Sequence, residues 1–214
     1  VAAIAAGRMH SLAMKADGTV VAWGSPSTVP NGLNGVVAVS AGWDRSMALK
    51  GNGTVVAWKD STLPVPADLS NVVAIAAGYH HCLALHADQT ITAWGFNDSS
   101  QADVPAGMSS VVSIASSGWF SMALQSNGRV MVWGSNAYGQ TNVPPALTNV
   151  VAIAGGGFHC MAIREDSTVA AWGDDNFGEA TVPAGLIGVA GVAGGWIHSL
   201  AMGSDGTGAA WGGD

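Results

Sequence analysis

The chain has 214 residues, a formal net charge of −7, 10% charged residues, 49% hydrophobic residues and 30 glycines. A chain of this length and composition can bury a large core and is typical of a close-packed β-protein, which excludes an intrinsically disordered one. Its 7 basic residues are scattered singly, so there is no basic patch to hold a phosphate backbone, and we expect no nucleic-acid partner.

A motif of fewer than forty residues occurs six times without insertions, and a tryptophan stands near the end of every copy. The tryptophans are Trp23, Trp58, Trp94, Trp133, Trp172 and Trp211. Thirteen residues before them stand His10, Arg45, His81, Phe120, His159 and His198. A period of this size indicates a repeat architecture. We expect one domain over residues 1–214, with repeats at approximately 1–35, 36–71, 72–110, 111–149, 150–188 and 189–214.

In chain order, each repeat predicts two strands, a tight turn and a third strand. In the third repeat we expect the strands at residues 72–78, 81–85 and 90–95. Both faces of the second strand are apolar, as expected where sheets stack face to face. The predicted turns are Asp17-Gly18, Asn52-Gly53, Asp88-Gln89, Asn127-Gly128, Asp166-Ser167 and Asp205-Gly206. Several of them are strong short-range hairpin signals.

A linker follows each of the first five tryptophans and ends in Val-Pro, at Val29-Pro30, Val65-Pro66, Val104-Pro105, Val143-Pro144 and Val182-Pro183. Proline cannot donate to a strand ladder, so each linker stays at an edge. Six consecutive meanders can bury both faces, either as a radial propeller or as a solenoid with polar end caps, and neither terminal repeat has such a cap. The sequence predicts an all-β propeller of six three-stranded antiparallel blades. The alternative is an incomplete seven-bladed ring.

The segment from Ala6 to Met14, followed by that from Asp17 to Gly24, resembles the repeat of the regulator of chromosome condensation family, and the likeness extends over all six copies. The short repeat and the linker from Trp133 to Pro144 are more similar to the bacterial branch that includes β-lactamase inhibitory protein II. The resemblance implies a propeller that binds another protein, with seven blades in both relatives. It also implies a bacterial protein that is secreted or held at the cell surface.

The six copies differ from one another at two places, and such positions are free to carry function. One is the pair of residues before the second strand, and five of the six pairs contain an aromatic residue. The other is the linker after the tryptophan. Repeat geometry places the pairs on one rim. The candidate partner-binding residues are Trp43, Asp44, Tyr79, His80, Trp119, Phe158, Trp196, Phe96, Tyr138 and Phe177.

Rigid aromatic side chains bury a large area at small entropic cost, so this rim predicts a protein interface. The resemblance adds an enzyme inhibited by the chain as a class of partner. Two alternatives stay open. The aromatic residues pack into neighbouring blades as filler, or each blade stacks a sugar and the protein is a multivalent carbohydrate-binding propeller.

Catalytic signatures are missing from the sequence. It contains no Gly-x-Ser-x-Gly elbow, no glycine-rich loop that leads into a helix and no recurring carboxylate pair. We expect no catalytic residues, no enzyme activity and no cofactor. Exchange-factor activity on a small GTPase is implied by the family name alone, and the acidic charge and missing basic tail argue against a chromatin role.

The repeat-equivalent histidines His10, His81, His159 and His198 invite a metal site. They lie on separate blades, whereas zinc needs ligands at about 2 Å around one point, so we expect structural hydrogen bonds and no metal. Cys82 and Cys160 are two blades apart, beyond the roughly 7 Å limit between α-carbons for a disulfide, and are expected to be buried thiols.

Two further segments have an expected role. Residues 174–179 carry the densest acidic cluster, which we expect to be a solvated linker. Residues 181–202 carry no formal charge, but their glycines match the linker and first strand of other repeats. We therefore expect no membrane insertion, and a monomer if the ring closes at six blades.

Overall fold

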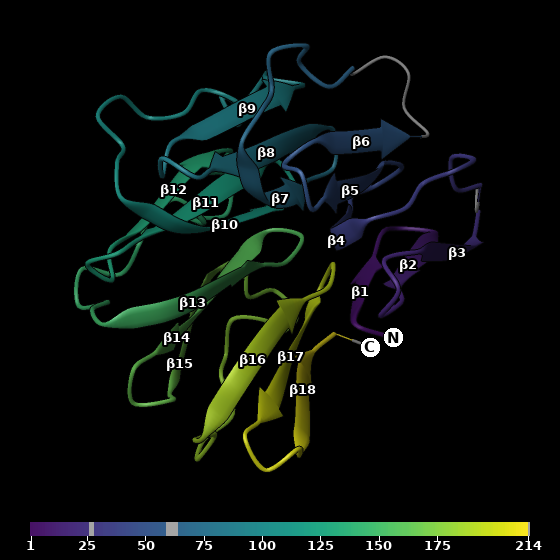
Figure 1. Cartoon of the computed structure of the whole chain (residues 1–214). Helices are drawn as coiled ribbons and strands as arrows, with labels where there is room; N and C mark the ends of the chain where they lie inside the picture. The colour runs from purple at the N-terminus through teal and green to yellow at the C-terminus, as the bar shows by residue number, and fades with distance from the viewer. Residues whose placement is uncertain (26–27, 59–63, 214) are drawn as a thin grey trace.

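The computed structural model describes residues 1–25, 28–58 and 64–213 (Figure 1). These residues form six three-stranded sheets, and each predicted repeat contains one sheet. The strands are β1 (Ala3–Ala6), β2 (His10–Met14), β3 (Val20–Gly24), β4 (Val36–Ala41), β5 (Ser46–Lys50), β6 (Val55–Trp58), β7 (Val72–Ala77), β8 (His81–His86), β9 (Ile91–Gly95), β10 (Val111–Ser117), β11 (Phe120–Gln125), β12 (Val130–Gly134), β13 (Val150–Gly155), β14 (His159–Arg164), β15 (Val169–Gly173), β16 (Val189–Gly194), β17 (His198–Gly203) and β18 (Gly208–Gly212).

Every sheet is an antiparallel meander in which the middle strand pairs with the strands before and after it. In the third sheet, Leu83 lies opposite Ala76 on β7 and opposite Ala93 on β9. The strand bounds expected for this repeat agree with β7, β8 and β9 to within one residue. The all-β architecture of six three-stranded antiparallel blades is confirmed.

The turn between the second and third strands is held by a side chain. Asp17 Oδ1 accepts hydrogen bonds from the backbone N–H of Thr19 at 3.0 Å and from the Thr19 hydroxyl at 2.7 Å. These bonds hold the pKa of the Asp17 carboxyl below its usual value. Gly18 follows with a φ of 75°, in the left-handed region that glycine adopts without strain. The predicted hairpin turn is confirmed in this repeat.

Consecutive sheets pack through their first strands. The first strand of each sheet lies over the first and middle strands of the preceding one, as β7 does over β4 and β5. Glycine makes this approach possible, since a Cβ on Gly42 would clash with the carbonyl oxygen of Gly78, and one on Gly157 with that of Trp196. The middle strands are thereby enclosed from both sides, and Leu83 is fully buried.

A layer of hydrogen bonds joins the middle strands of neighbouring sheets. The Nε2 atoms of three histidines lie within hydrogen-bonding distance of the serine hydroxyl of the next sheet: His10 to Ser46 at 3.0 Å, His81 to Ser121 at 2.9 Å and His159 to Ser199 at 2.8 Å. The structural role expected for the histidines is confirmed at these three positions.

The hydroxyls of Ser121 and Ser199 donate in turn to the backbone carbonyls of Gln101 and Glu179, both at 2.8 Å. Each hydroxyl has one proton, so His81 and His159 must donate to them from Nε2. Burial lowers the pKa of both histidines to about 4, which keeps the rings neutral.

Where a repeat has another residue in place of the histidine, the next sheet has cysteine in place of the serine. Arg45 Nη1 lies 3.6 Å from Cys82 Sγ, and Phe120 packs in the same apolar cluster as Cys160. Both cysteines are buried thiols that form no disulfide, as expected from the sequence. Histidine thus faces serine at three sheet interfaces, whereas arginine and phenylalanine face cysteine at the other two.

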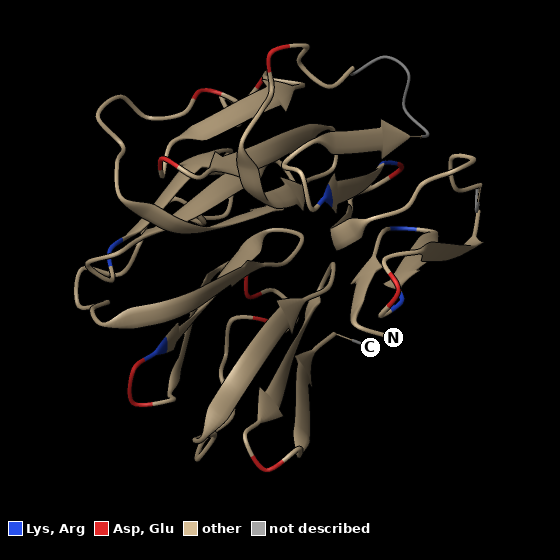
Figure 2. Ribbon diagram, in the orientation of Figure 1, with Lys and Arg blue, Asp and Glu red and all other residues tan. Residues whose placement is uncertain are grey.

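The acidic segment 174–179 is only in part the solvated linker that we expected, because Asp175 is exposed whereas Asp174 and Glu179 are buried. Glu179 is only 1% exposed, and its Oε2 accepts the backbone N–H of Phe177 at 2.8 Å. Gln101 and Gln140, fully buried, make the same bond to the N–H two residues earlier, at 2.9 Å. Glu179 therefore takes the place of a buried glutamine that shapes the linker. The other Asp and Glu residues lie in turns and linkers, and the Lys and Arg residues are scattered over the sheets (Figure 2).

The ring is open between its first and last sheets. In the described part of the chain, β16–β18 do not pack against β1–β3 as consecutive sheets pack against each other (Figure 1). Leu200 of β17 is 44% exposed, whereas its five repeat equivalents are fully buried. The structure therefore supports the predicted alternative, an incomplete ring. The expectation of a monomer depended on closure at six blades, so it no longer follows.

Candidate functional site

Five loops between a first and a middle strand present aromatic side chains at one end of the ring. The loops follow β4, β7, β10, β13 and β16, and they carry Trp43, Tyr79, Trp119, Phe158 and Trp196 respectively. Each residue lies one to three positions before the start of a middle strand, in the loop outside the paired strands. The structure brings all five together.

Three of these rings form the centre of the group. The Tyr79 ring stacks on the Trp196 ring with centroids 5.2 Å apart and an interplanar angle of 2°. Trp43 packs against both, with centroid distances of 4.5 Å to Tyr79 and 5.2 Å to Trp196. These residues come from loops of the second, third and sixth sheets, so their side chains meet across the centre of the propeller.

Further rings extend the group on both sides. Trp119 lies 6.3 Å from Tyr79, and Phe158 lies 5.3 Å from Trp196 between ring centroids. Phe96 and His80 contact Trp119 at 5.4 and 5.6 Å, and Tyr138 contacts Phe158 at 4.9 Å. We call these eight residues the aromatic cluster: Trp43, Tyr79, His80, Phe96, Trp119, Tyr138, Phe158 and Trp196.

Two candidate residues lie apart from the aromatic cluster. Phe177 is 58% exposed, and within the described residues it has no ring contact with the cluster. Asp44 is exposed beside Trp43 and carries no ring. The rim predicted from the repeats is therefore one connected surface for eight of the ten candidates.

The aromatic cluster is partly buried and partly open to solvent. Trp196 and Tyr138 are each 45% exposed and Phe96 is 39% exposed. Partial burial raises the pKa of the Tyr79 hydroxyl well above its usual value, so this group stays protonated. The surface is thus mostly apolar, and its polar atoms are the hydroxyls of Tyr79 and Tyr138 and the ring nitrogens of His80 and the tryptophans.

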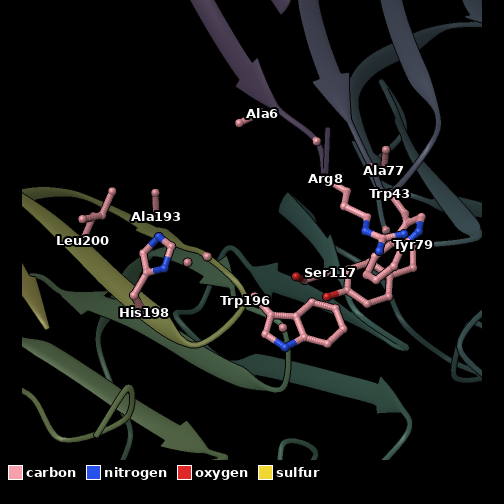
Figure 3. A pocket seen from close by; sticks show the side chains of 16 residues that line it. Ala6, Arg8, Trp43, Ala77, Tyr79, Ser117, Ala193, Trp196, His198 and Leu200 are labelled. Atoms are coloured by element: carbon pink, nitrogen blue, oxygen red, sulfur yellow. The ribbon is translucent and has the colours of Figure 1, made fainter. Parts of the chain in front are cut away.

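Trp43, Tyr79 and Trp196 line a cavity of about 700 Å³ (Figure 3). Its other walls come mainly from glycines and alanines at the ends of the first strands, with Arg8, Ser117 and His198 as the polar lining. The cavity extends from the first sheet to the sixth. A protruding side chain of a partner can therefore enter between the aromatic rings.

Arg8 belongs to the same surface and was missed as a site residue. Its guanidinium carbon lies 4.1 Å from the ring centre of Trp43, which is a cation–π contact. The sequence signal was its position, because Arg8-Met9 is the pair equivalent to Trp43-Asp44. It was passed over because this one pair lacks an aromatic residue.

Two other features bear on the chemistry of the described residues. They hold no three His, Cys, Asp or Glu side chains gathered closely enough to bind a metal ion together. They also form no helix of the length and hydropathy needed to cross a membrane.

Three solved structures are similar to this one over 98% of the chain. Yeast RCC1 (Prp20), solved bound to Kap60, is 22% identical with a TM-score of 0.80 over 69% of its chain. The CRINKLY WD40 ectodomain of the Arabidopsis thaliana receptor kinase ACR4 is 21% identical with a TM-score of 0.81 over 84% of its chain. Human WBSCR16 is 20% identical with a TM-score of 0.77 over 75% of its chain. These likenesses show the propeller fold.

No curated protein matches the sequence significantly. The sequence model of the regulator of chromosome condensation (RCC1) repeat matches residues 1–27, 72–101, 111–140 and 150–179, which is more than half of the chain. The matched segments fall on the first, third, fourth and fifth sheets. The chain is therefore a member of the RCC1 repeat family.

Proposed function

We propose that this chain is a non-catalytic binding propeller whose aromatic cluster contacts a partner protein, and that the partner is an enzyme which it inhibits. The observation that carries the proposal is the continuity of the cluster. Eight rings from five sheets and their linkers form one half-exposed apolar surface, and three of them, Trp43, Tyr79 and Trp196, line a cavity of about 700 Å³.

Rings that already support one another lose little freedom when a partner covers them, so their burial contributes efficiently to affinity. Arg8 adds a positive charge beside Trp43 that can meet a carboxylate of the partner. The fold is compatible with this role, since yeast RCC1 (Prp20) was solved bound to the protein Kap60. Kap60 is the partner of Prp20 and is not proposed as a partner of this chain.

The lining of the cavity favours binding over catalysis. Among the described residues it includes no carboxylate and no cysteine, and its titratable members are Arg8, Tyr79 and His198. A Tyr79 hydroxyl with a raised pKa does not act as a base near neutral pH. The proposal includes that the chain belongs to the bacterial branch and is secreted or held at the cell surface. Extracellular and cell-surface fractions are therefore used in the test.

The test compares two variants in pull-downs from extracellular and cell-surface fractions, with captured proteins identified and remeasured as purified pairs. The first carries Trp43→Ala, Tyr79→Ala, Trp119→Ala and Trp196→Ala. The second is the matched control Phe177→Ala, which removes an exposed ring outside the aromatic cluster. We expect the fourfold variant to lose the partner and the control to keep it, with a central ring contributing about 2 kcal/mol or more to binding.

Folding of both variants is checked by circular dichroism and thermal melting. Equal binding by the folded fourfold variant and the unchanged chain would contradict the proposal. A multivalent glycan screen runs beside the pull-down. A sugar bound through the same four residues, with no protein captured, would replace the protein partner with the carbohydrate alternative.

A further inference from the structure

The cavity of about 700 Å³ differs in charge from the rest of the molecule. The chain has 14 acidic and 7 basic residues and a net charge of −7. Among the described residues, in contrast, the lining of the cavity includes Arg8 and no Asp or Glu. Asp44 follows Trp43 in the sequence, but it is exposed and does not belong to the lining. A lining with this one charge favours an anionic ligand over a cationic one.

Arg8 is held at the cavity by the ring of Trp43. Its guanidinium carbon lies 4.1 Å from the ring centre, so the charged group covers one face of the indole. The N–H groups of a guanidinium lie in its own plane and form a fork that matches a carboxylate. In the part of the chain that the structure describes, no Asp or Glu forms an ion pair with Arg8. Its N–H groups are thus available to a carboxylate, which can accept two of them at once.

Two hydroxyls, those of Tyr79 and Ser117, line the same cavity (Figure 3). Burial raises the pKa of the Tyr79 hydroxyl, so this group keeps its proton and can donate it to a hydrogen bond. Across the described residues, neither hydroxyl has a hydrogen-bond partner within the protein. Arg8, Tyr79 and Ser117 therefore provide donors for a group that only accepts, and an ionised carboxylate is such a group.

Most of the remaining lining is apolar. The Trp196 ring is 45% exposed and is supported from one side by Tyr79, with the two ring centroids 5.2 Å apart. Glycines, alanines and Leu200 make up most of the other walls and leave space beside the rings. Aromatic molecules pack favourably on such rings, either offset and parallel or edge to face. The lining therefore favours a ligand that joins its anionic group to an aromatic body.

Size and charge narrow the class of ligand further. The volume of about 700 Å³ falls in the range of about 300 to 1,000 Å³ that is typical of small-molecule sites. A phosphate carries close to two negative charges near neutral pH. Among the described lining residues it would meet one guanidinium only, whereas a single carboxylate matches Arg8 in charge.

We propose that this cavity binds a small aromatic carboxylate. The carboxylate accepts hydrogen bonds from Arg8 and from the hydroxyl of Tyr79 or Ser117, and the aromatic body lies against Trp196. Such a molecule can occupy the cavity whether or not a protein covers the aromatic cluster, so this site goes beyond the proposed function. A peptide that ends in an aromatic residue carries the same chemistry at its C-terminus, and the test therefore includes both sources.

The test titrates the isotope-labelled chain with 2-naphthoate and follows the indole N–H signals by NMR, assigned with single Trp→Phe variants. We expect saturable shifts at Trp43 and Trp196, with a Kd of about 1 mM or tighter. The neutral amide 2-naphthamide has nearly the same shape and no charge. It should bind about tenfold more weakly, because it cannot form the charged pair with Arg8.

Arg8→Gln tests the charge, and Arg8 is exposed, so its replacement leaves the core intact. We expect this variant to bind 2-naphthoate about tenfold more weakly and 2-naphthamide as well as the unchanged chain does. Arg8→Lys should keep part of the preference for the carboxylate, since lysine retains the charge but lacks the planar fork. Arg129→Gln removes an exposed arginine outside the lining and is the matched control, for which we expect no change.

Equal affinity for the acid and the amide would overturn the proposal. The same holds if Arg8→Gln binds 2-naphthoate as tightly as the unchanged chain, or if Trp43 and Trp196 show no shifts up to about 10 mM ligand. A peptide ending in a free tryptophan carboxylate is compared with its amidated form. Binding of the peptide acid without binding of 2-naphthoate would overturn the small-molecule site and assign the cavity to the C-terminus of a partner.

The outcome is independent of the pull-down that tests the proposed function. Arg8→Gln retains every ring of the aromatic cluster, whereas the fourfold variant of the pull-down removes four of them. A protein captured through the rings without binding of 2-naphthoate would leave the proposed function standing and remove the carboxylate site. Binding of 2-naphthoate with no protein captured would give the reverse result.

Discussion

The third and sixth sheets have nearly the same sequence pattern in two different surroundings. Leu83 on β8 is fully buried and His81 is hydrogen-bonded to Ser121, whereas Leu200 on β17 is 44% exposed and His198 lacks such a bond among the described residues. The difference lies in the neighbouring sheet and not in the strand itself. The stability of this fold therefore resides at the interfaces between blades, as expected for a repeat protein.

The largest expected effect is the loss of stability at acidic pH, which comes from the buried histidines of the enclosed repeats. Burial lowers the pKa of His81 and His159 to about 4, against about 6.5 in the unfolded chain. Between these values the unfolded chain binds more protons, so the free energy of unfolding falls as pH drops from about 6.5 to about 4. The loss reaches up to about 3 kcal/mol for each of the two histidines.

Denaturant unfolding at pH 7, 5.5 and 4.5 measures this effect, and the double variant His81→Gln, His159→Gln is its control. The turn carboxylates such as Asp17 and Asp88 titrate below their usual value because of their threonine hydrogen bonds, so their contribution is lost at lower pH. A control variant with the same pH dependence as the unchanged chain would contradict the assignment to the two histidines.

The next largest effect on the free energy of unfolding comes from replacing leucine by alanine at two equivalent positions of the repeat. Leu83→Ala leaves a cavity in a fully enclosed site and should lower the free energy of unfolding by about 3 kcal/mol. Leu200→Ala removes a side chain that is 44% exposed and should lower it by less than about 1 kcal/mol. Chemical denaturation of the two variants provides the comparison, and equal losses would mean that the last sheet is covered in solution.

Much of this arrangement could be predicted from the sequence because it is encoded within each repeat. The turn at Asp17-Gly18, the three strands and the aromatic pair before the middle strand depend on residues a few positions apart. The open ring was predicted only as an alternative, since closure depends on the sum of five interface angles that no single repeat encodes. The aromatic cluster was foreseen as a rim, but the contact of Tyr79 with Trp196 requires the curvature of the whole ring.

Two residues were misjudged for a different reason. Glu179 was grouped with the charged residues around it, although Gln101 and Gln140 at equivalent positions already indicate a buried hydrogen bond to the linker. Arg8 was passed over because its neighbour is not aromatic, although cation–π contact with Trp43 gives it the same place on the surface. Comparison of the copies position by position contains both signals.

The smallest effect concerns the serine at the start of the middle strand. The Ser199 hydroxyl receives the bond from His159 and donates to the carbonyl of Glu179, both at 2.8 Å. Ser199→Ala leaves the Nε2–H of His159 without this acceptor in a buried site, whereas the Glu179 carbonyl keeps its hydrogen bond from Trp211 Nε1 at 3.0 Å. The variant should lower the free energy of unfolding by about 1 to 2 kcal/mol. Ser11→Ala, at the equivalent position on the open face, should change it by no more than about 0.5 kcal/mol.

Thermal melting of the two serine variants gives this comparison. Ser199 lies between two packed sheets, so its replacement should lower the melting temperature. Ser11 lies on the first sheet, next to the opening of the ring, and its replacement should leave the melting temperature nearly unchanged. A Ser11→Ala variant that destabilises the six-repeat chain as much as Ser199→Ala would show that β1 already has a neighbour, because the bond is lost only where a partner sheet provides it.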